Sequence, residues 1–74
     1  MKLSELKIGQ IGKISKINQC EISIILIERG FIKGEEIEVL HSDIFNDVRI
    51  YQIMGAKIAL RKSEANIIEV NLLN

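Results

Sequence analysis

Several features are scarce or absent in this chain of 74 residues: it has no tryptophan, no proline and a single cysteine. Because Cys20 has no partner within the chain, the fold must stand without an internal disulfide, as in a reducing compartment. No apolar run approaches the ~20 residues that span a bilayer, and residues 1–7 are too polar for a secretory signal. We therefore expect a cytoplasmic protein that does not itself insert into a membrane.

An excess of charge of one sign is also missing, since ten basic and ten acidic residues cancel. The charges alternate along the chain, so neither the basic footprint of a nucleic-acid binder nor a polybasic membrane patch is visible. A chain of this length is expected to form one domain, residues 1–74, and to bury only about 60–65% of its unfolded surface. Such a small core leaves little room for a deep catalytic cleft, which argues against an enzyme.

Isoleucine is the residue that the chain has in abundance, at 16 of 74 positions. Because β-branched side chains favour extended backbone, a mainly β fold is expected. Alternation and glycine breaks predict five short strands, over residues 10–17, 36–40, 48–54, 57–61 and 67–70. The third and fourth form a hairpin through Gly55-Ala56, and a helical turn over 63–66, capped by Ser63, precedes the last strand. Short, glycine-punctuated strands usually close into a small barrel, which removes exposed edges.

Residues 21–29 predict the one substantial helix, inserted after the first strand. Gly30 stands where a helix of this length needs a left-handed cap. Phe31 can then fold back on Leu26 or Ile27 as the apolar contact that accompanies such a cap. Propensity alone would also allow a strand over residues 22–27, and the cap decides in favour of the helix.

This helix carries more apolar side chains than one buried face can hold. They wrap nearly all round it: Ile22, Ile24, Ile25, Leu26 and Ile27. A helix packed on one side of a small barrel cannot bury them all, so one side should be exposed and make a protein contact. The residues predicted for partner binding are Ile24, Ile27, Phe31 and Ile32, with Arg61 and Glu64 at the corner after the hairpin as a further pair.

Motifs that carry chemistry are absent: there is no phosphate-cradling glycine loop, no CxxC and no HExxH. A nucleophile needs a nearby base, yet Cys20 and His41 fall on different predicted elements, and a lone cysteine is more typical of an apolar filler. His41, Asp43 and Asp47 share one polar loop over 41–47, but a metal site needs three or four convergent ligands. We expect no catalytic residue, no metal ligand and no cofactor, which leaves binding as the function.

Three residue patterns that follow one another along the chain point to a particular protein family. They read Leu3-x-x-Leu6-x-x-Gly9-x-x-Gly12-x-Ile14, then Leu26-x-x-x-Gly30-Phe31-x-x-Gly34-x-x-Ile37-x-Val39, then Gly55-x-x-Ile58-Ala59-Leu60-Arg61-x-x-Glu64-Ala65-x-x-Ile68-x-Val70. In this order and spacing the chain resembles the FeoA family, the small cytosolic component of bacterial ferrous iron uptake. The resemblance implies an SH3-like β-barrel with a helix inserted after the first strand.

The resemblance also implies a function. FeoA proteins are partners of the membrane permease FeoB, so a non-catalytic accessory protein that docks on its cytosolic GTPase domain is implied. FeoA-like domains also form the C-terminal part of the iron- and manganese-dependent repressors of the diphtheria-toxin-repressor type. A metal-sensing domain that binds a transition metal ion directly is therefore an alternative. A third is an SH3-like peptide-binding module, but such grooves are lined with aromatics, and only three aromatic residues are present. The exposed helix side could contact FeoB or a second copy of the chain.

The chain departs from the family pattern at three places. Arg29 stands where Leu or Met usually precedes the helix-ending glycine, and Lys33 stands where Pro is usual. The loop that often reads Pro-Phe-Gly-Asp-Pro keeps only Phe45 and Asp47. These changes leave the implied fold intact but weaken what the resemblance implies about contacts made by that loop.

Overall fold

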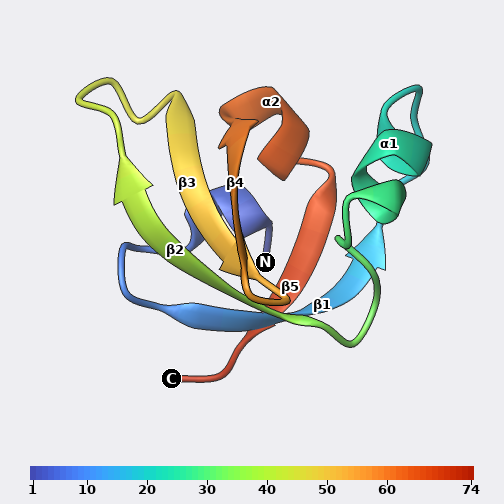
Figure 1. Cartoon of the computed structure of the whole chain (residues 1–74), viewed down its shortest axis with the longest axis horizontal. Coiled ribbons are helices and arrows are strands. Elements are labelled where there is room, and N and C mark those ends of the chain that lie inside the picture. The colour runs from blue at the N-terminus through green and yellow to red at the C-terminus, as the bar shows by residue number, and fades with distance from the viewer.

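Five antiparallel strands in one sheet form the framework of the protein (Figure 1). The computed structural model describes all residues from 1 to 74. The strands are β1 (Ile11–Ile17), β2 (Glu36–Ser42), β3 (Val48–Ile53), β4 (Ala56–Arg61) and β5 (Ile68–Leu72). They lie in the order β4-β3-β2-β1-β5, so β4 and β5 are edges that do not pair with each other. The mainly β class with five strands is confirmed, whereas the expected closure of the sheet into a barrel is wrong.

Three short helical segments connect or precede the strands (Figure 1). They are the 3-10 helix η1 (Leu3–Glu5), α1 (Ser23–Glu28) and α2 (Lys62–Ala65). Both helices predicted along the chain exist, but α1 is shorter than residues 21–29. The cap of α2 also differs from the prediction: Ser63 lies inside the helix, and the backbone N–H of Arg61 donates to Glu64 Oε1 at 2.8 Å. A side chain reaching back from the third helical position closes this first turn.

The end of α1 follows the predicted glycine cap. Gly30 has a φ of +103°, in the left-handed region that a side chain disfavours. The Phe31 N–H donates to the Leu26 carbonyl at 3.0 Å, and the Gly30 N–H donates to the Ile27 carbonyl at 3.0 Å. These two bonds are the pair that defines a Schellman motif. The motif turns the chain sharply and sends Phe31 into the core.

The β3–β4 hairpin turns one residue earlier than the sequence suggested. Ile53 pairs with Ala56, so the two turn residues are Met54 and Gly55 instead of Gly55 and Ala56. Both have positive φ, +52° and +78°, as a two-residue type I′ turn requires. A left-handed backbone conformation costs about 1–2 kcal/mol at a residue other than glycine, so the sequence does not indicate Met54 as a turn residue. Its Sδ lies only 3.2 Å from where a Cβ on Gly30 would stand, so the side chain covers the end of α1.

The β2–β3 and β1–β5 strand pairs each contain a shift in register. The register of β2 against β3 shifts between Val39 and His41, and the strand then continues to Ser42. Such a bulge breaks the alternation of apolar and polar residues, and so the sequence placed His41 in a loop. In β1 the register against β5 shifts between Ile14 and Lys16, and not at Gly12. Gly12 instead permits a close approach, since a Cβ there would lie 3.1 Å from Val70.

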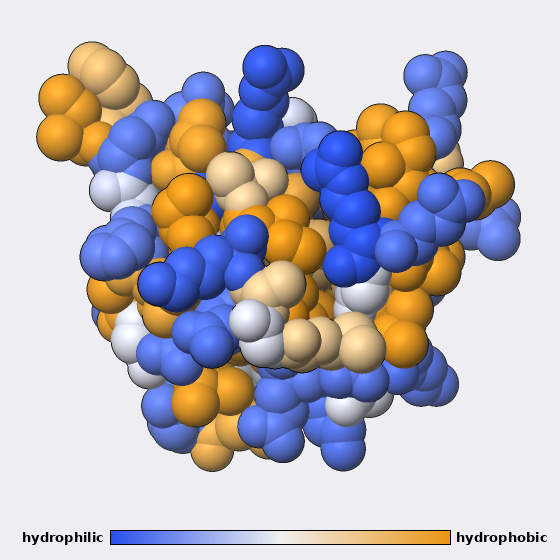
Figure 2. Space-filling model, in the orientation of Figure 1, coloured by the Kyte–Doolittle hydropathy of each residue, from blue (hydrophilic) through white to orange (hydrophobic).

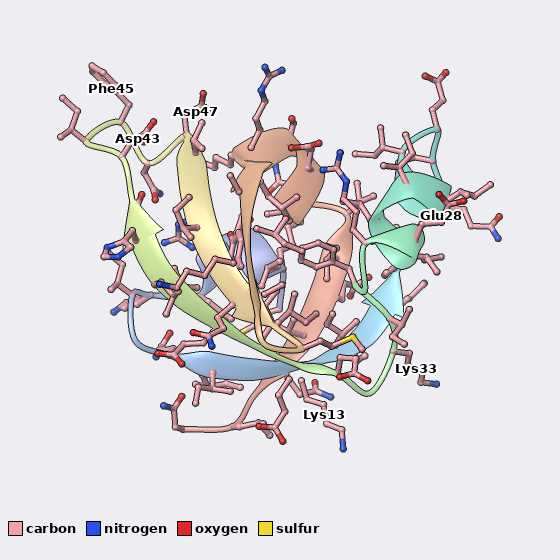
Figure 3. The ribbon with its side chains drawn as sticks, in the orientation of Figure 1. Lys13, Glu28, Lys33, Asp43, Phe45 and Asp47 are labelled. Carbon is pink, nitrogen blue, oxygen red and sulfur yellow. The ribbon has the colours of Figure 1, made fainter.

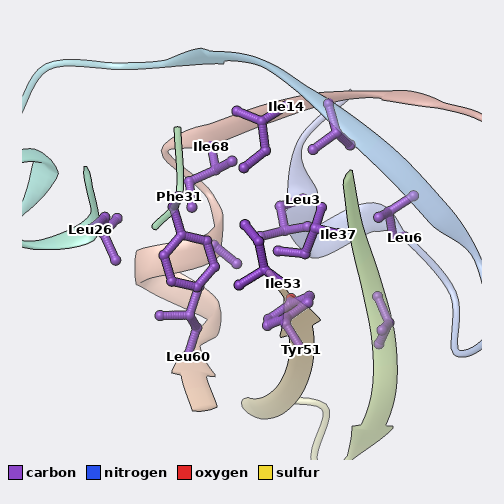
Figure 4. Packing of buried hydrophobic residues seen from close by; sticks show 13 residues of the cluster. Leu3, Leu6, Ile14, Leu26, Phe31, Ile37, Tyr51, Ile53, Leu60 and Ile68 are labelled. Atoms are coloured by element: carbon purple, nitrogen blue, oxygen red, sulfur yellow. The ribbon is translucent and has the colours of Figure 1, made fainter. Parts of the chain in front are cut away.

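One cluster of buried apolar residues forms the core beneath the curved sheet (Figure 4). Its 13 members include Leu3 and Leu6 from the N-terminal segment, Leu26 and Phe31 from the region of α1, and residues of every strand. The buried Arg49 ties the N-terminal segment to β3, donating to the Leu6 carbonyl at 2.5 Å and the Ser4 carbonyl at 3.2 Å. The core therefore fixes where the outer face of α1 and the β2–β3 loop stand.

Candidate partner-binding surface

The outer face of α1 is apolar and exposed. Within this six-residue helix only Ser23 and Leu26 are buried, because only one side of it meets the core. Four isoleucines remain in contact with solvent, and we call them the helix patch: Ile24, Ile25, Ile27 and Ile32. Ile24 is 66% exposed and Ile27 47%. Figure 2 shows apolar surface gathered at the right of the molecule, over α1.

A groove runs beside the helix patch. It has a volume of about 340 Å³ and lies between the second half of β1 and the segment from α1 into the connector before β2. Its lining residues, which we call the helix groove, are Ser15, Lys16, Ile17, Ile27, Ile32 and Lys33. Three isoleucines give it an apolar character, and two lysines add positive charge to its lining. Such a surface suits an apolar ligand flanked by acidic groups.

The other predicted contact residues fall in different places. Phe31 is fully buried, so its side chain cannot take part in the exposed face and instead supports α1 from the core. Arg61 is exposed at the end of β4, and Glu64 is half-buried in α2. The Glu64 carboxylate is engaged by the Arg61 backbone in the cap of α2, which gives this pair a local structural role.

The sequence did not single out the most exposed apolar pair in the protein. Ile44 and Phe45 are 92% and 82% exposed at the tip of the β2–β3 loop. This loop projects at the upper left of Figures 1 and 3, away from α1. The signal was present in the sequence as two adjacent large apolar residues between Asp43 and Asp47 in an otherwise polar stretch.

No cluster of metal-ligating side chains forms anywhere in the structure. Three or more His, Cys, Asp or Glu residues are nowhere grouped closely enough to hold an ion, and His41, Asp43 and Asp47 are no exception. Cys20 is a free, exposed thiol. None of the helices has the length and the apolar character that crossing a lipid bilayer requires.

Tyr51 has a pKa that is raised above its ordinary value. Burial of the ring raises the pKa of its hydroxyl, and the neighbouring positive charge of Arg49 only partly opposes this rise. No group accepts or donates a hydrogen bond at Tyr51 Oη with normal geometry, so the interaction with Arg49 is weak and burial dominates. The side chain packs in the closed core, which marks this perturbed group as structural rather than catalytic.

Two relatives whose family is known are similar in sequence to this chain over its whole length. A protein of Campylobacter jejuni assigned as Fe(2+) transport protein A is 36% identical over 74 residues, covering 99% of this chain and all of that protein. A fusion of Fe(2+) transport protein A with the Fe(2+) transporter FeoB, from Porphyromonas gingivalis, is 32% identical over 75 residues. That match covers all of this chain and 9% of the fusion.

Solved structures show the same fold. The solution structure of iron(II) transport protein A from Clostridium thermocellum superposes with a TM-score of 0.93 at 36% identity, covering 99% of this chain and 46% of that one. FeoA of Stenotrophomonas maltophilia in complex with zinc, described as a prokaryotic SH3 domain protein, gives 0.87 at 29% identity, with coverages of 96% and 89%. The SH3-like character of the fold is thereby confirmed. The FeoA domain family model matches residues 1–72, and the chain therefore belongs to the FeoA domain family.

Proposed function

We propose that this chain is a non-catalytic accessory protein of ferrous iron uptake that docks, on the cytoplasmic side, to a FeoB-type permease. The fusion protein of P. gingivalis supports this partner, because a sequence like this chain is there joined to FeoB in one polypeptide. Such covalent linkage holds two proteins at high effective concentration, as is useful for modules that act together. The full-length match to an Fe(2+) transport protein A supports the process.

The helix patch carries the proposal. Isolated exposed apolar residues are ordinary, but a contiguous group on one element of a small protein indicates an interaction site. Three of its four isoleucines lie within the short helix α1, where the fold needs only Leu26 and Ser23 to be buried. The isoleucines of the outer face are therefore better explained by a partner than by stability.

The contact would combine this patch with the groove beside it. Ile27 and Ile32 belong to both surfaces, so an apolar side chain of the permease that enters the groove would touch them together. Buried apolar anchors at the centre of an interface typically dominate its binding energy. Arg61 is exposed and remains a second proposed contact, whereas Glu64 would act through the cap that positions it.

The experiment is a binding titration between the purified chain and the cytosolic domain of FeoB from the same organism, with and without guanine nucleotide. Ile27→Glu should weaken binding by about 30-fold, the effect of losing a ~2 kcal/mol hot spot. The matched control is Ile8→Glu, which places the same charge at an isoleucine 61% exposed outside the helix patch and should bind like the wild type. Absence of wild-type binding in either nucleotide state, or equal losses in both variants, would count decisively against the proposal.

Direct binding of a transition metal ion is a second candidate, favoured by the zinc complex of the S. maltophilia relative. His41 at the end of β2 is close in sequence to Asp43 and Asp47 of the β2–β3 loop, and weak binding there would need a rearrangement that brings the three side chains together. Calorimetric titration with Fe(II) or Mn(II), repeated on His41→Ala, tests this. Heat that saturates at one ion per chain and vanishes in the variant would support the candidate, and heat that the variant retains would exclude this loop.

A further inference from the structure

Two exposed features of the chain fit each other. The first is the apolar tip, which we define as Ile44 and Phe45 together with Asp43 and Asp47 at the base of the same loop. The second is the helix groove, whose isoleucines are accompanied by Lys16 and Lys33. The tip offers two large apolar side chains flanked in sequence by two carboxylates, and the lining of the groove offers three isoleucines together with two lysines.

The loop that displays the apolar tip is extensively hydrogen-bonded. The Asn46 N–H donates to the Asp43 carbonyl at 3.1 Å, and the Asp47 N–H donates to Asp43 Oδ1 at 2.8 Å. Asn46 has a φ of +56°, and its Oδ1 accepts from Ser42 Oγ at 2.9 Å and from Arg49 Nε at 3.0 Å. The pair at the apex is therefore held out into solvent by a built turn, and docking it costs little ordering entropy.

The size of the helix groove suits such a tip. At about 340 Å³ it lies at the small end of the range of ligand pockets, ~300–1,000 Å³. A space of this kind accommodates one or two large side chains and is too small for a helix. Lys16 and Lys33 would face Asp43 and Asp47, and complementary charges of this sort set the orientation of a contact.

Within one molecule the two features cannot meet. The apolar tip projects at the left end of the view and Lys33 lies at the right, so they stand apart along the longest dimension of 28 Å (Figure 3). We propose that the apolar tip of one copy docks into the helix groove of a second copy, head to tail. This self-recognition goes beyond the proposed docking to a permease, because it involves the chain alone.

Such a contact is heterologous, which determines how an assembly grows. Each copy that uses its tip still has a free groove, and each copy that uses its groove still has a free tip, so the assembly extends or closes into a ring rather than stopping at a dimer. A four-residue tip covers far less than the ~1,200 Å² of a stable interface, so the association is weak and appears only at high concentration. Salt weakens it, because the flanking charges are exposed.

Sedimentation of the purified chain from about 10 μM to about 1 mM tests the proposal, since weak complexes have dissociation constants in this range. The weight-average mass of the wild type should rise with concentration without a plateau at the dimer, unless a larger closed ring forms. Phe45→Ser and Lys33→Glu should each remain at the monomer mass, while Ile8→Ser should assemble like the wild type. Circular dichroism checks that each variant keeps its fold.

Mixing the two blocked variants gives the sharpest result. Phe45→Ser retains a working groove and Lys33→Glu retains a working tip, so an equimolar mixture should form a dimer and nothing larger. A charge exchange supplies a second route: Asp47→Lys and Lys33→Asp should each fail alone, and the double variant that carries both substitutions in one chain should recover part of the association. A wild type that stays monomeric throughout, or variants that assemble unchanged, would overturn the proposal, as would a wild-type plateau at the dimer.

Discussion

The sheet and α1 use the same amino acid in opposite ways. In the strands, Ile14, Ile37 and Ile53 are almost completely buried, whereas in α1, Ile24 and Ile27 are largely exposed. A strand with period two sends alternate residues into the core, so an isoleucine-rich strand still hides its apolar side chains. A short helix against one side of the core buries a single stripe. The isoleucines of α1 therefore contribute little to the fold, and a partner is the better explanation for them.

The largest effect on stability is expected when a buried side chain is removed. Phe31→Ala should lower the free energy of unfolding by about 3–5 kcal/mol, because it leaves a cavity where the chain leaves α1 and enters the core. Urea denaturation followed by circular dichroism measures the loss. A domain of this size has little stability to spare, so partial unfolding without denaturant would agree with the prediction. A loss below about 1 kcal/mol would mean that Phe31 is not a core residue.

Gly30, at the boundary between the two regions, should give an intermediate effect. Gly30→Ala forces a side chain into a backbone with a φ of +103° and should cost about 1–2 kcal/mol. The nearby Met54 Sδ is part of a flexible side chain and can move aside, so backbone strain dominates. Gly30→Asn is the matched variant, since asparagine tolerates this conformation and should recover part of the loss. Equal stability of the alanine variant and the wild type would argue against the Schellman cap.

A smaller effect concerns the hydroxyl of Tyr51. Because burial raises the pKa of Tyr51, the folded state holds this proton more tightly than the unfolded state does. Its contribution to stability is therefore complete below the unfolded value of about 10 and is lost as the pH rises through the folded pKa. Tyr51→Phe should lack this alkaline loss. At neutral pH it should match the wild type to within about 1 kcal/mol, because the hydroxyl has no good partner to lose.

Absorbance of the phenolate checks the same residue without a mutation. Tyr51 is the only tyrosine, so its ionisation can be followed directly in the folded protein. An apparent pKa at or below the ordinary value would contradict burial as the dominant influence on this group.

The smallest effect on stability is expected at an exposed isoleucine of α1. Ile24→Ala should change the free energy of unfolding by no more than about 0.5 kcal/mol, as is usual for surface positions. The same urea experiment as for Phe31→Ala gives the measurement, so the two values can be compared directly. A loss of 2 kcal/mol or more would place Ile24 in a packed environment and remove the main argument for the helix patch.

Much of the fold followed from local signals in the sequence. The strands followed from alternation, as in Ile37 and Val39, and the end of α1 followed from Gly30, because one glycine decides a left-handed cap. The open sheet did not follow, since whether β4 meets β5 depends on the curvature accumulated over all strands. The turn at Met54 was also missed, because tertiary contact with the end of α1 overrides the local preference for glycine or asparagine.

The candidate site was only partly predictable. An excess of isoleucine in a short helix showed that some would be exposed, and Ile24, Ile27 and Ile32 are. Phe31 was misplaced because the Schellman motif that follows from Gly30 directs it inward. The apolar tip was missed although Ile44 and Phe45 stand out between Asp43 and Asp47 in the sequence, because adjacent apolar residues also occur inside strands.

The helix patch is the surface that we propose meets the permease. The most direct measurement is an NMR titration of the labelled chain, kept dilute, with the unlabelled cytosolic domain of FeoB. Signals of Ile24, Ile25, Ile27 and Ile32 should shift or broaden first, while those of Ile8 and of the β2–β3 loop, which projects away from α1 (Figure 1), should stay unchanged. Changes that spare α1 and gather elsewhere on the sheet would contradict this proposal.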